Sequence, residues 1–146
     1  MAEIQLKKLT KRWGNFTAVD DFNLTIADKE FLVLLGPSGC GKTTTMRMIA
    51  GLEDATDGEI LVDGKKINDL EPKDRDVAMV FQSYALYPNM NVYDNIRFPL
   101  KVRGIDKSTH NEKVMRAVKM VELENCLHRK PAELSGGQRQ RVALAR

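Results

Sequence analysis

The sequence predicts an α/β fold that combines an antiparallel β subdomain, a core of buried central strands and an α-helical subdomain. Phe22–Ile26 alternates apolar and polar residues, as a half-buried strand does. Phe31–Leu35 and Val77–Phe81 are continuously apolar, which is typical of central strands covered on both faces. Apolar residues recur at helical spacing from Ser108 onward. Strands are therefore expected first and a helix-rich region after them.

The other elements of the first half follow in chain order. Ile4–Leu9 has a loose strand pattern, and Lys11–Asn15 is expected to turn. Lys42–Ala50 has helical composition, with Gly51 as its C-cap. The Asp-Gly pairs on either side of Glu59–Val62 predict a β-hairpin over residues 60–67.

Three helices are expected in the second half. Asn91 is placed to cap a short helix through Phe98 that ends before Pro99. The amphipathic helix after Ser108 presents Val114, Ala117, Val118 and Val121 on one face. Pro131 then interrupts the chain, and a last helix begins near Ser135.

Composition favours a globular protein of the cytoplasm. The 146 residues are 42% apolar and 29% charged, and no apolar run approaches the roughly 20 residues of a membrane span. The first residues lack the basic and apolar regions of a signal peptide. Cys40 and Cys126 are too few for a disulfide framework and lack zinc-ligand spacing.

Charge is unevenly distributed along the chain. Residues 1–100 carry 12 basic and 15 acidic side chains, whereas residues 101–146 carry 11 and 5. A basic tail would suit nucleic acid, but these positive charges are scattered among carboxylates rather than clustered. We therefore predict no nucleic-acid partner.

A glycine-rich segment, Gly36–Thr43, carries the strongest functional signal. It reads GPSGCGKT and satisfies the G-x-x-x-x-G-K-[ST] pattern of a phosphate loop between a strand and a helix. Such a loop turns several backbone N–H groups toward a phosphate, and the helix N-terminus adds positive potential. Lys42 is predicted to reach the β- and γ-phosphates, and Thr43 to ligate Mg²⁺. The expected ligand is Mg-ATP, contacted by Gly36, Pro37, Ser38, Gly39, Cys40, Gly41, Lys42, Thr43 and Thr44.

A second motif, Leu134–Gln138, reads LSGGQ. Ser135 as N-cap with Gln138 three residues later would make a capping box, a purely structural role. Two glycines in the first turn of a helix, however, destabilise it by roughly 1 kcal/mol each relative to alanine. Gly136 and Gly137 are therefore expected to admit an anion close to the helix end.

Together, the phosphate loop and this pentapeptide resemble the ATP-binding cassette (ABC) ATPases. The resemblance implies a RecA-like P-loop NTPase core that binds and hydrolyses ATP with Mg²⁺. It also implies that Trp13 stacks on adenine, although Trp13 could instead anchor the first sheet. Gln82 matches the glutamine that contacts Mg²⁺ and the attacking water, so it joins Lys42 as a catalytic residue and Thr43 as a metal ligand; its alternative is an exposed loop residue.

The resemblance also implies partners. Ser135, Gly137 and Gln138 match residues that close on the γ-phosphate of ATP held by a second ATPase subunit, with Gly136 in the same turn. Two subunits would enclose two ATP molecules head to tail.

Three stretches narrow the resemblance to the ATPases of maltose and glycerol-3-phosphate type importers: Gly36–Glu53, Pro72–Pro88 and Asn91–Leu100. In that group a membrane permease docks near Ser83–Leu100 and works with an extracytoplasmic solute-binding protein. The chain would then be peripheral on the inner face of the cell membrane. The apolar loop residues Tyr84, Leu86 and Tyr87 suit such docking, or they pack locally in the core.

The family pattern divides the chain into a nucleotide-binding core (1–90), a helical subdomain (91–134) and a last part (135–146) that holds the signature motif, Ser135–Gln138, with its helix. The same pattern implies a core that is incomplete at the C-terminus. A magnesium-binding aspartate, a general-base glutamate and a sensing histidine would follow Arg146. His110 and His128 match none of these and are expected at the surface. The 146 residues alone are expected to bind ATP weakly or not at all, without hydrolysis.

Two alternatives remain beside a carbohydrate-importer motor. One is a soluble ABC protein without a permease, acting in translation or DNA repair. The other is a non-catalytic nucleotide-binding fragment. The similarity over Ser83–Leu100 favours the importer.

Overall fold

The computed structural model describes residues 2–146 and divides into two compact units. The first unit is Met1–Met79 and the second is Val80–Arg146. Each unit has its own apolar core, so each is described by itself.

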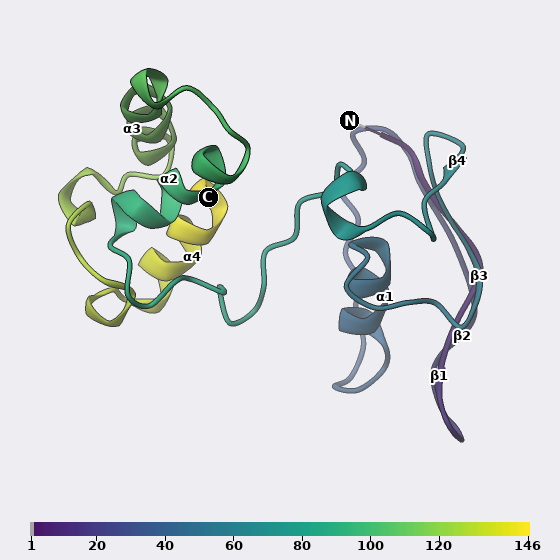
Figure 1. Ribbon diagram of the computed structural model, residues 1–146. Helices are drawn as coiled ribbons and strands as arrows, with labels where there is room; N and C mark the ends of the chain where they lie inside the picture. Colours follow the sequence, from purple (N-terminus) through teal and green to yellow (C-terminus); the bar gives the residue numbers. More distant parts are fainter. Residues whose placement is uncertain (1) are drawn as a thin grey trace. The chain divides into compact units, whose positions relative to one another are not determined.

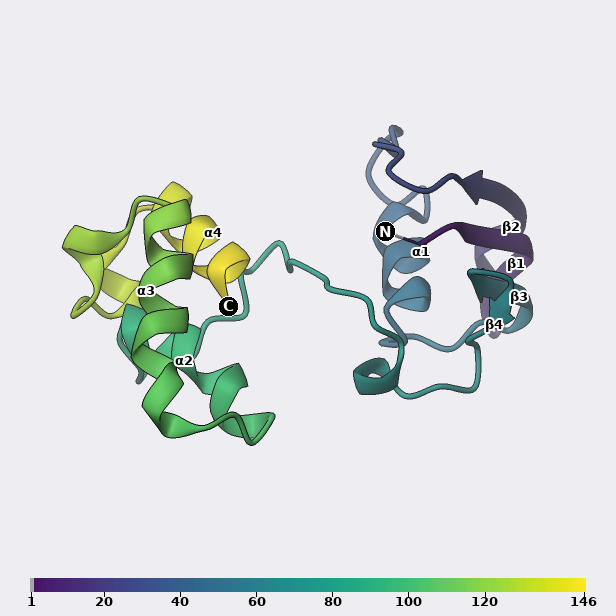
Figure 2. The same ribbon diagram turned by 90° about the horizontal axis from the view of Figure 1, so that it is seen from above.

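A four-stranded antiparallel sheet forms the first unit (Figure 1). Its strands are β1 (Ile4–Trp13), β2 (Phe16–Ile26), β3 (Asp57–Val62) and β4 (Lys65–Lys66), in the spatial order β2-β1-β3-β4. Helix α1 (Lys42–Ile49) lies against one face of this sheet (Figure 2). The predicted strands at Ile4–Leu9 and Phe22–Ile26 are confirmed as parts of β1 and β2, although β1 continues to Trp13.

The core of this unit lies between the sheet and α1. Alternate side chains of a strand point to opposite faces, so one face of β1, β2 and β3 supplies the apolar residues. Met48 of α1 packs against them. The buried members are Leu6, Leu9, Val19, Met48, Ile60 and Ile67.

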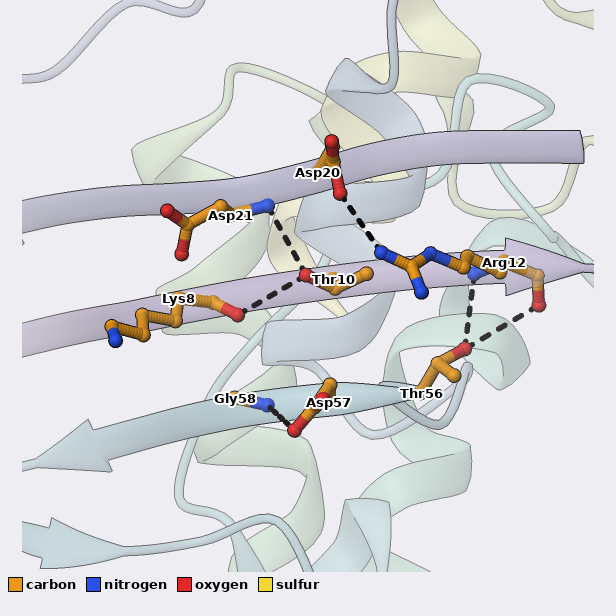
Figure 3. Close-up of polar contacts among 8 residues, drawn as sticks. All are labelled: Lys8, Thr10, Arg12, Asp20, Asp21, Thr56, Asp57 and Gly58. Carbon is orange, nitrogen blue, oxygen red and sulfur yellow. Dashed lines mark hydrogen bonds and ion pairs between the residues drawn. The ribbon is translucent and has the colours of Figure 1, made fainter.

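Bulges bend this sheet where β1 meets both of its neighbours. β1 contains one more residue than its partners between Leu6 and Thr10, and Lys8 has a left-handed φ of 52°. The Thr10 hydroxyl donates to Lys8 O at 3.2 Å and accepts from Asp21 N at 3.1 Å (Figure 3). A Cβ at Gly58 would lie 2.3 Å from Lys8 O, so the bulged strand requires glycine on β3.

The predicted hairpin is confirmed by β3 and β4. Its turn is Asp63-Gly64, with φ values of 49° and 73°. Positive φ at both central residues is the geometry of a type I′ turn, which favours Asp-Gly. The other Asp-Gly pair does not turn the chain: Asp57 and Gly58 begin β3 at the bulge.

The strands predicted at Phe31–Leu35 and Val77–Phe81 are wrong in this structure. Neither segment forms a strand in residues 2–146, and the Phe31 and Leu35 side chains are 90% and 87% exposed. A central parallel strand needs hydrogen-bonded neighbours on both sides, and every strand pairing within the described residues is antiparallel. Both segments are apolar, but residues 2–146 contain no strand that pairs with them.

A buried arginine ties α1 to the rest of its unit. Arg75 donates to Met48 O at 2.7 Å, Leu70 O at 2.8 Å and Asn68 O at 2.8 Å. Burial lowers the pKa of Arg75 below its usual value. Because Met48 lies in the last turn of α1, the guanidinium also faces the negative end of the helix dipole. A Cβ at Gly51 would lie 2.5 Å from Arg75 Nε, so the chain after α1 requires glycine there.

Arg75→Met is expected to lower the free energy of unfolding by about 2–4 kcal/mol, because it leaves several buried carbonyls without donors. Urea-induced unfolding of the full-length protein would measure this loss. Arg47→Met is the matched control: Arg47 is exposed, with a 3.4 Å hydrogen bond to Leu52 O and a 3.9 Å ion pair to Glu53, and its loss should change stability by less than about 1 kcal/mol. Equal losses in the two variants would contradict the clamp assigned to Arg75.

The second unit is helical. It contains α2 (Val92–Val102), α3 (His110–Met120) and α4 (Gly136–Ala145), with short 3₁₀ turns between them (Figure 1). The predicted apolar face of α3 is confirmed, since Val114 and Val118 are fully buried. The core is completed by Val92, Ile96, Leu123, Cys126, Leu134 and Val142.

The start of α2 agrees with the sequence, but its end does not. Asn91 caps the helix, since its Oδ1 accepts from Asp94 N at 2.8 Å. The helix then continues through Pro99 to Val102, beyond the predicted end at Phe98. Leu100 packs against the helical core, so tertiary contacts keep this turn helical although Pro99 lacks an N–H.

The prediction that His110 lies at the surface is wrong. Its side chain is buried at the start of α3, with Nε2 2.9 Å from Ile105 O. Nδ1 accepts from Arg97 Nε at 3.1 Å. Both ring nitrogens therefore have partners, which removes the main cost of burying this polar ring. His128 is exposed, as predicted.

Candidate functional site

The phosphate loop leads into α1 in the first unit. Gly36, Gly39 and Gly41 have φ values of 153°, 84° and 87°, a region that residues with a Cβ rarely adopt. A Cβ at Gly36 would lie 2.6 Å from Cys40 Sγ, and one at Gly41 would lie 2.5 Å from Ala18 O. The glycines at these two positions thus allow a close approach of backbone to neighbouring atoms.

Lys42 is folded over this loop. Its ammonium donates to Gly36 O and Pro37 O at 2.7 Å each and lies 3.3 Å from Cys40 Sγ. These interactions hold one positive charge, the Lys42 ammonium, against the carbonyls of the loop. Such a charge can move to an anionic ligand at the cost of two exposed hydrogen bonds to carbonyls.

The first turn of α1 is fixed from within. Thr45 N and Thr45 Oγ1 both donate to Gly41 O, at 2.8 Å and 3.0 Å. Thr43 is exposed and Thr44 is half-buried. This turn contains no acidic side chain that would neutralise its positive end. The helix end is therefore suited to a phosphate.

A cavity of about 240 Å³ adjoins the loop. One side is formed by β2 and the other by Cys40, Gly41, Lys42 and Thr45. The β2 residues that line it are Ala18, Val19, Asp20 and Phe22. Sequence reasoning missed this wall, because the contact between Ala18 and Gly41 joins segments more than twenty residues apart and leaves no local pattern.

Trp13 lies at the end of β1 and is 45% exposed. Its ring stacks on Phe16 with centroids 6.3 Å apart, and Lys11 Nζ lies 5.2 Å from the Trp13 ring. Lys11 also binds Glu53 at 2.7 Å, and this hydrogen-bonded ammonium lowers the pKa of the Glu53 carboxyl. Trp13 is thus outside the buried core of the sheet. Its stacking on adenine remains a prediction.

Ser135–Gln138, here called the signature turn, begins α4 in the second unit. Ser135 Oγ accepts from Gln138 N at 3.3 Å, and Gln138 Oε1 accepts from Ser135 N at 2.9 Å. The capping box is therefore confirmed. The capping box uses Ser135 and Gln138 and not the two glycines. A Cβ at Gly137 would meet no atom within 4 Å, so the turn is open to solvent at Gly137.

Gln82 and the segment after it also belong to the second unit. Gln82 is exposed in a turn. Leu86 packs against the helical core, so the local packing role applies to this residue. Tyr87 is partly exposed, and its ring lies 4.7 Å from that of Phe98.

The structure groups the predicted residues within each unit. The first unit gathers Lys42, the loop glycines and Cys40, with Trp13 outside the cavity lining. The second unit holds Gln82 and the signature turn. None of the helices described for residues 2–146 has both the length and the apolar character that a membrane span requires.

Comparison with curated proteins gives relatives that match the whole chain. The oligosaccharides import ATP-binding protein MsmX of Bacillus subtilis is 58% identical over 147 residues, and the trehalose import ATP-binding protein SugC of Mycobacterium tuberculosis is also 58% identical. The sn-glycerol-3-phosphate import ATP-binding protein UgpC of Bartonella quintana is 55% identical. The chain covers 40%, 37% and 42% of these relatives' lengths.

Solved structures show the same fold. The dimeric structure of the bacterial ABC transporter cassette MJ0796 matches with a TM-score of 0.86 and 35% identity, over 97% of this chain and 67% of that one. Its post-hydrolysis state bound to ADP and Pi matches equally well. The predicted α/β fold of the P-loop NTPase class is therefore confirmed. Residues 19–146 match the ABC transporter family, and the chain belongs to that family.

Proposed function

We propose that the chain forms the ATP-binding part of an ATP-hydrolysing ABC importer subunit, for a carbohydrate or related solute. The observation that carries this proposal is the glycine loop at the start of α1, closed by the Lys42 ammonium at 2.7 Å from two of its carbonyls. Relatives at 55–58% identity are named as import proteins for oligosaccharides, trehalose and sn-glycerol-3-phosphate.

The loop residues fit a triphosphate. Gly36 and Gly41 leave no room for a Cβ against Cys40 and Ala18, so the loop keeps its tight backbone, and Lys42 supplies a positive charge. The Thr43 hydroxyl would hold Mg²⁺, and the ion would neutralise charge on the phosphates. Trp13 presents an exposed ring for the adenine base.

A second copy of the subunit would complete each site. Ser135–Gln138 would contact the γ-phosphate of ATP on the partner, through the open side of the turn at Gly137. The likeness to a dimeric cassette supports this arrangement.

The importer assignment implies two further partners. Permease subunits would dock near Ser83–Leu100, where Tyr87 leaves an aromatic ring partly exposed. An extracytoplasmic solute-binding protein would deliver the solute to the permease. The subunit would then lie in the cytoplasm, on the inner face of the cell membrane.

Alkylation of Cys40 tests the nucleotide site. We expect iodoacetamide to modify Cys40 in the full-length protein, because this thiol is exposed on the loop. Mg-ATP at saturation should slow the modification at least about tenfold by covering the loop, and prior alkylation should block nucleotide binding. Mass spectrometry of the peptide that contains Cys40 measures the rate.

Cys126 provides the control within the same molecule. It is buried in the helical core, so it should react slowly with or without nucleotide. If Cys40 is modified equally fast with and without Mg-ATP, the phosphate loop is not the nucleotide site.

A further inference from the structure

The segment 83–87 contains a strained backbone. Tyr84 and Ala85 have φ values of 62° and 47°, so two consecutive residues with side chains lie in the left-handed region. Such a conformation is strained and persists only where surrounding contacts hold it. Contacts from elsewhere in the second unit must therefore maintain this conformation.

Arg139 of α4 provides one of these contacts. Its guanidinium carbon lies 5.9 Å from the centroid of the Tyr84 ring, within the range of a cation–π interaction. Arg139 Nη1 also donates to Leu134 O at 2.7 Å, immediately before the signature turn. The side chain that contacts Tyr84 is thus fixed to the start of its own helix.

Arg146, the residue that follows α4, provides a second contact. Its Nη1 donates to Ala85 O at 2.6 Å, and its guanidinium carbon lies 5.3 Å from the Tyr87 ring centroid. The strained segment is therefore held at two points, by Arg139 near the start of α4 and by Arg146 just after its end.

Tyr84 also lies near the start of α4. A Cβ placed on Gly136, the first residue of this helix, would come within 3.8 Å of the Tyr84 hydroxyl. Tyr84 therefore contacts Arg139 and lies close to Gly136, both in the first turns of α4.

We propose that Tyr84 and Arg139 form a positioning contact that couples the backbone of residues 83–87 to the first turn of α4. A protein bound to residues 83–87 would then change how Ser135–Gln138 is presented to a nucleotide. This last step rests on the proposed function, whereas the coupling itself depends only on the contacts described. Neither Tyr84 nor Arg139 need touch ATP for the coupling to operate.

The test changes the segment and reads the helix. Ala85→Pro forces φ to about −65° and so removes the left-handed conformation of residue 85, and it also restricts the backbone of Tyr84, while both the Tyr84 and the Arg139 side chains are kept. Amide hydrogen exchange at residues 138 and 139 reports opening of the turn, because Gln138 N and Arg139 N donate to Ser135 Oγ and O. In the full-length protein, Ala85→Pro should raise these two exchange rates at least about fivefold.

A double-mutant cycle separates coupling from local damage. In a Tyr84→Ala, Arg139→Ala background, Ala85→Pro should change the same rates by less than about twofold. The contact at the first turns of α4 is then gone, and the remaining Arg146 contact lies at the other end of the helix. Tyr84→Phe keeps the aromatic ring. In a Tyr84→Phe background with Arg139 intact, Ala85→Pro should again raise the exchange rates at residues 138 and 139 in full. Tyr93→Ala is the matched control: the Tyr93 hydroxyl contacts Asn111 of α3, so exchange should rise in α3 and not at residues 138 and 139.

An unchanged exchange rate at residues 138 and 139 in Ala85→Pro would overturn the proposal. So would an equal increase with and without Tyr84 and Arg139, since α4 would then sense the segment by another route. These measurements require no ATP. Absence of Mg-ATP hydrolysis by the full-length wild-type protein would refute the proposed function. The exchange measurements in the variants would still decide whether the coupling exists.

Discussion

Lys42→Ala is expected to weaken Mg-ATP binding to the full-length protein at least about 100-fold, equivalent to about 2.7 kcal/mol. The Lys42 ammonium donates hydrogen bonds to Gly36 O and Pro37 O and so places a positive charge on the phosphate loop. Hydrogen bonds from a charged donor to phosphate contribute about 1.5–3 kcal/mol each, and alanine can make none. Isothermal titration calorimetry with Mg-ATP measures the loss.

A lysine of the same unit serves as control. Lys66 lies on β4, where its ammonium pairs with Glu59 at 3.2 Å in solvent. Lys66→Ala removes the same charge from the protein and should leave the affinity within about twofold. Wild-type affinity in Lys42→Ala would show that the loop does not bind phosphate through this residue.

Ser135→Arg is expected to lower steady-state ATP hydrolysis at least about 100-fold while leaving ATP binding to the phosphate loop intact. The long side chain would occupy the open end of α4, where the γ-phosphate of ATP on the partner subunit is proposed to lie. Arginine also removes the N-cap hydroxyl, which costs about 1 kcal/mol of helix stability. Phosphate release and nucleotide affinity are therefore measured together with thermal unfolding.

Ser108→Arg separates position from side-chain bulk. Ser108 is exposed in the 3₁₀ turn before α3, so the same change there should leave turnover near the wild-type value. Normal hydrolysis by Ser135→Arg would reduce the signature turn to its capping box.

Local chemistry explains which features could be predicted from the sequence. The caps at Asn91 and Ser135 and the turn at Asp63-Gly64 depend on residues within a few positions, and all three are confirmed. The phosphate loop is likewise a local pattern, and the close contacts of Gly36 and Gly41 show why glycine stands at these positions.

Features that depend on distant partners were missed. An apolar run at Phe31–Leu35 indicates burial only if neighbouring strands exist, and none pairs with it within the described residues. His110 is buried because Arg97 and the Ile105 carbonyl satisfy its ring nitrogens, and neither contact has a sequence signature. The wall that Ala18 gives to the loop belongs to the same class.

The exposed run at residues 31–35 also has a consequence for the handling of the chain in a cell. FLVLL combines high β-propensity with no charge and no proline, the composition of segments that associate into intermolecular sheets. Phe31, Val33 and Leu35 all lie at the surface in this structure. While this run is uncovered, as during synthesis on the ribosome, its composition makes it prone to aggregate. The segment that leads into the phosphate loop is thus also an aggregation-prone segment.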